Sequence, residues 1–108
     1  MDFDTLKIEI NELSKSIEKI KEALGYENKL KEIKKLEEET LLPGFWDNKE
    51  NSTKVVTKMK NIKNIIQKID EIVRELSDAK GYFELAEELN DNLSFKESQN
   101  LVNKLKES

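Results

Sequence analysis

Hydrophobic side chains recur at alternating spacings of three and four residues along the first part of the chain. The positions in this stripe are Phe3, Leu6, Ile10, Leu13, Ile17, Ile20 and Leu24. Such spacing draws one apolar line along an α-helix and is typical of a helix packed lengthwise on another. It predicts a helix over residues 2–24, which Gly25 ends. Ile8 lies roughly opposite the stripe, so we expect a single exposed residue; a second contact surface is the alternative.

A shorter amphipathic pattern predicts a second helix over residues 27–41. Its apolar positions are Leu30, Ile33, Leu36 and Leu41. The run of glutamates at residues 37–39 is interpreted as a solvated face, since runs of like charge seldom enter a core.

Residues 40–47 form the main break in the helical pattern. Pro43 followed by Gly44 indicates a turn. Asp47 then fits a capping box with Glu50 and predicts the start of the next helix. Phe45 and Trp46 directly precede this cap. We expect both rings to be buried and to anchor the turn; an exposed aromatic contact site is the alternative.

The third predicted helix, residues 48–89, is the longest. Its heptad positions are Val55, Met59, Ile62, Ile66, Ile69, Val73, Leu76 and Phe83, and a flanking row contains Ile65, Ile72, Ala79 and Ala86. A stripe of this width suits a helix that packs against two neighbours. At 1.5 Å per residue this helix is about 60 Å long, so an elongated molecule or a bent helix is expected. Gly81 lies inside the pattern and predicts a kink or a close helix approach.

A fourth helix is predicted over residues 94–107, after a loop at 90–92. Ser94 and Glu97 fit a second capping box, and the inner face contains Phe95, Leu101, Val102 and Leu105. The fold class predicted is therefore all-α: a single domain over residues 1–108, formed as an elongated antiparallel, coiled-coil-like bundle of three to four helices. Because the pattern stops without a cap, we expect a fragment of a longer protein.

Composition narrows the chemistry that this chain can perform. The 108 residues include no Cys and no His, and three isolated glycines. Zinc, haem and iron–sulfur sites therefore lack their usual ligands, and nucleophilic chemistry based on Cys or His is absent. Glycine-rich phosphate loops are absent too. No apolar run reaches the roughly 18 residues that a membrane span needs. We expect no enzyme activity, no cofactor, no metal, no membrane partner and a cytoplasmic location.

One segment departs from the mildly acidic balance of the chain. Residues 49–68 contain six lysines and one acid, Glu50, which gives a local net charge of +5. Such a segment could meet phosphate groups. The candidate ribosome or RNA contacts are Lys54, Lys58, Lys60 and Lys63. By helical angle these lysines spread over the whole polar face, so a solvated face is the favoured interpretation.

The break between the second and third helices resembles a known pattern. An acidic run, then Pro-Gly-Phe-Trp-Asp-Asn at residues 43–48, then a long helix with Gly-Tyr-Phe-Glu-Leu-Ala at 81–86, resembles the N-terminal domain of bacterial peptide chain release factor 2. The resemblance covers essentially the whole chain. It implies a helical ribosome-docking domain that faces the large-subunit stalk base, with the release-factor recycling GTPase as a further partner.

The same resemblance implies what the chain lacks. Factors of this family act at UGA and UAA codons, which they read with a Ser-Pro-Phe tripeptide, and they trigger peptide release with a Gly-Gly-Gln motif. Neither motif is present, because the only proline is followed by Gly44 and no two glycines adjoin. The expected role is therefore docking alone. A fragment with such wide apolar stripes could also self-associate, and the alternative function is that of a generic coiled-coil scaffold protein.

Overall fold

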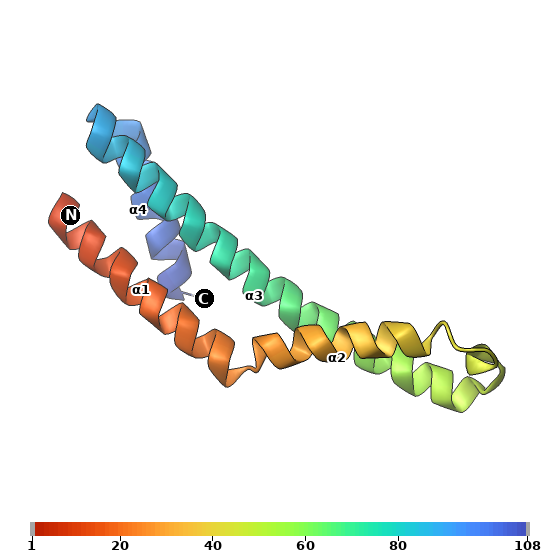
Figure 1. Ribbon diagram of the computed structural model, residues 1–108. Helices are drawn as coiled ribbons and strands as arrows, with labels where there is room; N and C mark the ends of the chain where they lie inside the picture. Colours follow the sequence, from red (N-terminus) through yellow and green to blue (C-terminus); the bar gives the residue numbers. More distant parts are fainter. Residues whose placement is uncertain (1, 108) are drawn as a thin grey trace. The chain divides into compact units, whose positions relative to one another are not determined.

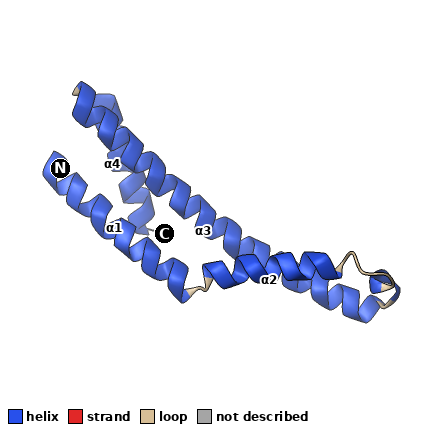
Figure 2. Cartoon of the chain, viewed as in Figure 1, coloured by secondary structure: helices blue, strands red, loops and turns tan. Residues whose placement is uncertain are grey.

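The computed structural model describes residues 2–107, and every regular element within them is helical (Figure 2). In chain order these elements are α1 (Phe3–Ala23), α2 (Tyr26–Glu39), the short 3-10 turn η1 (Phe45–Asp47), α3 (Lys49–Leu89) and α4 (Asn92–Glu107) (Figure 1). The all-α class predicted from the heptad pattern is confirmed. The helix ends differ from the predicted ones by at most two residues, and η1 is the one element that the pattern did not predict.

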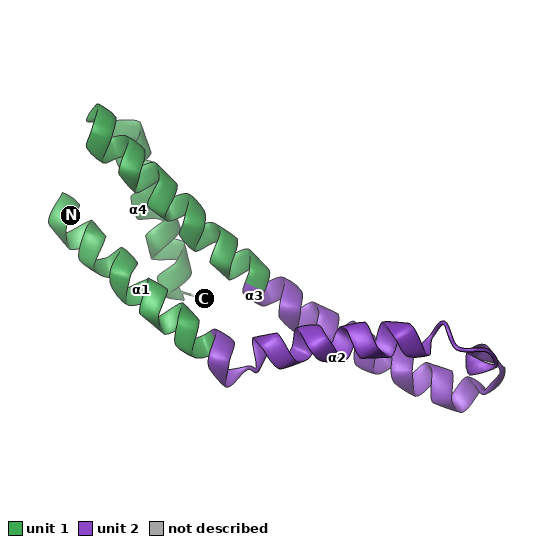
Figure 3. Cartoon of the chain, viewed as in Figure 1, with its two compact units in different colours: residues 1–20, 70–108 green, residues 21–69 purple. Residues whose placement is uncertain are grey.

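The chain divides into two compact units (Figure 3). Residues 1–20 and 70–108 form unit 1, which contains most of α1, the second half of α3 and all of α4. Residues 21–69 form unit 2, which contains α2 and the first half of α3. The number of helices that cover the wide apolar stripe of α3 differs between the two units.

Unit 1 is a three-helix bundle with one continuous core. Its buried residues are Leu6, Ile10, Ile17, Leu76, Ala79, Phe83, Val102 and Leu105. Three rings, one from each helix, close its end: the centroid of Phe3 lies 5.7 Å from that of Phe83 and 4.9 Å from that of Phe95. The first five positions of the α1 stripe, from Phe3 to Ile17, face this core, as the spacing predicted. The last two positions, Ile20 and Leu24, are 45% and 42% exposed, so the prediction is wrong for them. The wide stripe of α3 faces the core here because α3 has two helical neighbours.

Helix α4 approaches α3 closely because both contribute small residues to their interface. Ala79 and Ala86 on α3 and Ser98 on α4 are all 0% exposed. The Ser98 hydroxyl donates a hydrogen bond of 2.7 Å to the backbone carbonyl of Ala79. The sequence prediction placed Phe95, Leu101, Val102 and Leu105 on this face but missed its serines. The repeat of Ser94 and Ser98, one turn apart, was the available signal.

Unit 2 is an antiparallel helical hairpin formed by α2 and the first half of α3 (Figure 1). Its buried apolar residues are Ile33, Phe45, Ile62 and Ile69. The predicted inner position Leu41 is wrong: α2 ends at Glu39, and the Leu41 side chain is 83% exposed. With only one helix covering α3, unit 2 has a narrower core than unit 1, and this limits how many large side chains it can bury.

Two glycines differ in their place in the helical structure. Gly25 ends α1 in the left-handed conformation, with φ of 64°, as its position predicted. Gly81, by contrast, lies within an unbroken α3, and a Cβ added to it would meet no atom within 4 Å. The structure therefore shows no interruption of the helix at Gly81 and no close approach of another part of the described chain. Glycine in a helix interior costs about 1 kcal/mol relative to alanine.

The N-terminus of α3 is capped one residue later than predicted. The Asn48 side-chain oxygen accepts a hydrogen bond of 3.1 Å from the Asn51 amide. The predicted capping box of Asp47 and Glu50 is wrong because Asp47 belongs to η1, which leaves Asn48 as the residue with extended backbone (φ −97°, ψ 94°). Glu50 instead pairs with Lys54 at 3.8 Å, one helical turn away.

The N-terminus of α4 is capped by Asp91, three residues earlier than predicted. One carboxylate oxygen accepts the Leu93 amide at 3.0 Å, and the other accepts the Ser94 hydroxyl at 2.8 Å. The predicted box of Ser94 and Glu97 is wrong because Ser94 already lies inside the first turn, where it is buried. Aspartate is a strongly preferred N-cap residue, and here Asp91 rather than Ser94 caps the helix.

We expect the Asp91 cap to make unit 1 sensitive to acid. The Ser94 hydroxyl, together with the Leu93 amide, holds the pKa of Asp91 below its ordinary value of 3.8. A folded-state pKa that is lowered contributes stability above the unfolded pKa, and this stability is lost as the pH falls through the folded pKa. Asp91→Asn keeps a capping oxygen but does not titrate. Urea midpoints at pH 5 and pH 3 should fall more in the native chain than in this variant; equal falls would contradict the cap.

Candidate interaction surface at the hairpin tip

Residues 40–48, which we call the hairpin tip, connect α2 to α3 through a tight turn. The Phe45 amide donates to the Leu42 carbonyl at 3.2 Å, with Pro43 and Gly44 between them. Gly44 has φ of 80° and ψ of −1°, the values of the third residue in a type II turn, where glycine is favoured and proline commonly precedes it. The Pro-Gly pair thus forms the turn that the sequence predicted.

The two aromatic residues of the hairpin tip have opposite environments. Phe45 is 8% exposed, whereas Trp46 is 61% exposed. Their ring centroids lie 4.8 Å apart in an edge-to-face arrangement, and the Trp46 indole donates a hydrogen bond of 3.1 Å to the Thr40 carbonyl. The expectation that both rings are buried is therefore right for Phe45 and wrong for Trp46. Phe45 is buried in the core of the two-helix hairpin, whereas Trp46, the next residue of η1, points largely to solvent.

The hairpin tip exposes a concentration of apolar side chains. Leu41 and Leu42 are 83% and 60% exposed and accompany the exposed indole of Trp46. A shallow depression beside them is lined by Glu39, Leu42, Pro43, Gly44, Phe45, Asn48 and Asn51. Exposed tryptophan and leucine held on a tight, hydrogen-bonded turn are features of protein contact sites rather than of an ordinary loop.

The four candidate lysines do not converge into one patch. Lys58 pairs with Glu32 at 2.9 Å and Lys63 with Glu37 at 3.9 Å. These two contacts run from α3 to α2, and helical periodicity places them on either side of the buried stripe. Lys54 pairs only along its own helix, with Glu50. Within residues 2–107, Lys60 has no ion pair. Two of the four lysines therefore flank the hairpin interface, and Lys54 and Lys60 point elsewhere on the polar face.

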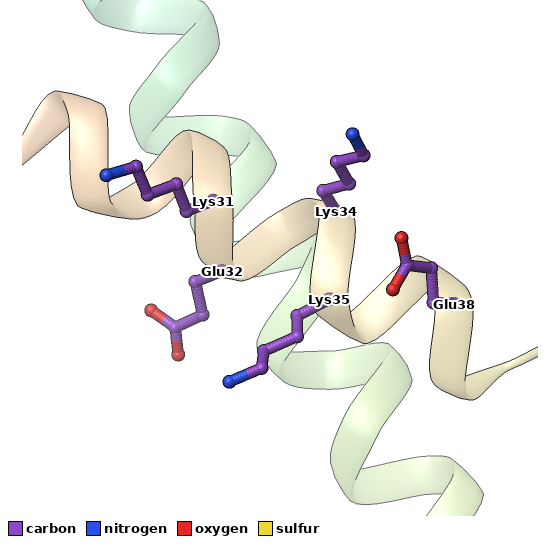
Figure 4. A pocket seen from close by; sticks show the side chains of 5 residues that line it. All are labelled: Lys31, Glu32, Lys34, Lys35 and Glu38. Atoms are coloured by element: carbon purple, nitrogen blue, oxygen red, sulfur yellow. The ribbon is translucent and has the colours of Figure 1, made fainter.

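One depression of the described surface is formed by a single helix. A depression on α2 is lined by Lys31, Glu32, Lys34, Lys35 and Glu38, and Figure 4 shows these five side chains spreading outward from one helix. Side chains that diverge in this way cannot converge on a reacting atom or exclude water. Across residues 2–107, no group of three or more acidic side chains is placed to hold a metal ion. No described helix is long and apolar enough to cross a membrane.

Comparison with known proteins identifies relatives of this chain. No protein-family model matches the chain. Over 88 residues it is 27% identical to peptide chain release factor 2 of an Exiguobacterium species and 28% identical to that of Staphylococcus haemolyticus. Over 83 residues it is 29% identical to that of Streptomyces avermitilis. The resemblance to release factor 2 is thus confirmed.

These matches cover most of this chain but little of each relative. They include 77–82% of the chain and 23–24% of the relative's length. The chain therefore spans about a quarter of the length of the curated relatives it matches.

Proposed function

We propose that this chain is the N-terminal ribosome-docking domain of a translation termination factor of the release factor 2 kind. The observation that carries the proposal is the match of about four fifths of the chain to four proteins of that name. The Pro-Gly-Phe-Trp-Asp-Asn segment, which carried the resemblance in the sequence, forms the hairpin tip with its exposed indole. A segment that carries the sequence resemblance thus has the features of a contact site.

The proposed role is positional and not catalytic. Peptide release at UGA and UAA codons would depend on parts of the factor outside this chain, since the codon-reading and hydrolytic motifs of the family are absent from it. The chain would hold the factor at the large-subunit stalk base, with the recycling GTPase as a further partner. Such work takes place in the cytoplasm, where ribosomes meet free release factors.

Two kinds of surface on unit 2 suit a ribosome, which offers both protein and RNA. The exposed Leu41, Leu42 and Trp46 fit a protein contact. Lys54 and Lys60 carry positive charge outward from α3 and fit phosphate groups. Lys58 and Lys63 pair with Glu32 and Glu37 of α2 and contribute less, because binding an external phosphate would give up contacts that join the two helices. The pair of Lys54 with Glu50 lies within α3 and joins no second helix.

We expect the 108-residue chain to co-sediment with purified large ribosomal subunits and to bind less tightly as salt rises. Lys54→Glu combined with Lys60→Glu should weaken binding and reduce the slope of log affinity against log salt by about 2, since each phosphate contact contributes about one unit. The matched control is Lys15→Glu with Lys19→Glu, two exposed lysines of α1, which should leave the slope unchanged. Absence of co-sedimentation would contradict docking, and an equal effect of both double variants would contradict the lysine assignment.

A further inference from the structure

The second half of α3 carries an apolar face that nothing in the described chain covers. Tyr82, Leu85 and Leu89 are 38%, 44% and 68% exposed. Their spacings of three and four residues place them on one side of the helix. This side differs from the one that carries Ala79, Phe83 and Ala86 into the core of unit 1. We call the three exposed residues the outer face of α3.

Gly81 leaves the backbone open beside the outer face. A shallow depression is lined by Ser77, Asp78, Gly81, Tyr82 and Leu85. Gly81 adopts no left-handed conformation, and a Cβ placed on it would meet no atom within 4 Å. The chain itself therefore gains nothing from a helix-weakening residue at this position. On the inner side of the same helix, small residues mark the place where α4 packs closely, and Gly81 provides the same opening toward solvent.

The rim of the outer face is acidic. Asp78 and Glu88 are exposed and lie on the same side of α3 as its apolar residues, and neither has an ion pair within residues 2–107. The nearest lysine on the helix, Lys80, bonds to Ser14 of α1 and is directed toward that helix. The exposed Arg74 is on the same side of α3 as Asp78, but it lies about two turns before Tyr82 and about three turns before Leu85. An acidic rim repels RNA phosphates, and it also repels a second copy of the chain, which would bring the same carboxylates.

We propose that the outer face of α3 docks a basic amphipathic helix of a partner protein. The leucines of that helix would cover Tyr82, Leu85 and Leu89, and its lysines or arginines would pair with Asp78 and Glu88. The open backbone at Gly81 lets the partner helix approach closely. This surface lies in unit 1 and goes beyond the proposed ribosome contact at the hairpin tip of unit 2, and its test requires no ribosome.

The test uses the ¹⁵N-labelled 108-residue chain and two designed helical peptides with the same leucine stripe. One peptide has lysines beside the stripe and the other has glutamates. We expect the lysine peptide to bind at least about tenfold more tightly. Its amide signal changes should centre on Gly81, Tyr82, Leu85 and Leu89. Equal affinity for both peptides, or changes centred on the hairpin tip, would overturn the proposal.

Variants distinguish binding at the outer face from non-specific hydrophobic binding. Leu85→Ser combined with Leu89→Ser should lower the affinity for the lysine peptide by about tenfold or more, because both exposed side chains contact the peptide in the proposed complex. Ile8→Ser, an equally exposed aliphatic position on α1, should leave its affinity unchanged. Asp78→Lys with Glu88→Lys should reverse the preference toward the glutamate peptide. Failure of that reversal would overturn the charge argument.

Two further measurements test which kind of molecule covers the outer face. Sedimentation of the free chain should give a monomer; a dimer that Leu85→Ser dissociates would show that a second copy covers this face. Poly(U) RNA should leave the Gly81 and Leu85 signals in place. Movement of those signals by RNA would show a nucleic-acid site and overturn the assignment to a protein helix.

Discussion

Leu6→Ala should destabilise the chain by about 3 kcal/mol or more, the loss expected when a fully buried leucine is truncated in a packed core. Leu6 is 0% exposed and lies in the core of unit 1, among residues contributed by α1, α3 and α4. Truncation removes apolar contacts with all three helices and leaves a cavity that rigid helix packing cannot close. Because a domain has only about 5–15 kcal/mol of net stability, this loss is a large fraction of the total and should lower the urea midpoint markedly.

Ile8→Ala is the matched control for this measurement. Ile8 lies two residues further along the same helix, and its side chain is 58% exposed. Ile8 is therefore exposed, as expected, but it is not the single exposed isoleucine of α1, because Ile20 is 45% exposed. Its truncation should change the free energy of unfolding by only about 0.5 kcal/mol in either direction. Urea unfolding followed by circular dichroism at 222 nm measures both variants. Similar losses in the two would contradict the orientation of α1.

Phe45→Ala should cost about 3 kcal/mol, the lower end of the range for a buried aromatic, because the core of unit 2 has only two helices. Trp46→Ala should cost about 1 kcal/mol or less, since that ring is mostly in solvent and loses one exposed hydrogen bond to Thr40. The two residues are adjacent, and both are aromatic. Their difference in stability therefore reports the geometry of η1 directly.

Tryptophan emission gives an independent check on the same arrangement. Trp46 is the only tryptophan of the chain, so the fluorescence of the folded protein reports this residue alone. Its emission should lie near that of a solvent-exposed indole and should be quenched readily by acrylamide. A blue-shifted, protected emission would show a buried ring, as would a loss for Trp46→Ala that equals the loss for Phe45→Ala.

Helical periodicity predicted those parts of the fold that depend on a repeated contact. The stripe that contains Leu6, Ile10 and Ile17 predicted both the helix and its buried side, because every third or fourth residue meets the same neighbour. The double row on α3 predicted two neighbours, and α1 and α4 supply them in unit 1. These features follow from local spacing, and no knowledge of the register between helices was needed.

Features that depend on local competition or on register were not predictable in this way. Asp47 and Asn48 are both good caps, and only the length of η1 decides between them. The environments of Phe45 and Trp46 depend on how many helices cover the turn, which the sequence does not state. The pairing of Lys58 with Glu32 depends on the register of α3 against α2. The sequence therefore identified the candidate lysines but could not show which of them are held within the hairpin.

The most direct test of the proposed docking role is a domain exchange in a known termination factor. Residues 1–108 replace the matching segment of Staphylococcus haemolyticus release factor 2, and peptide release is measured on ribosomes stalled at a UGA codon. Controls are the parent factor, the factor without the segment, and a factor with an unrelated helical hairpin in its place. The account predicts that the chain restores most of the parent's release rate and that the unrelated hairpin does not. Release no faster than from the factor without the segment would contradict the account.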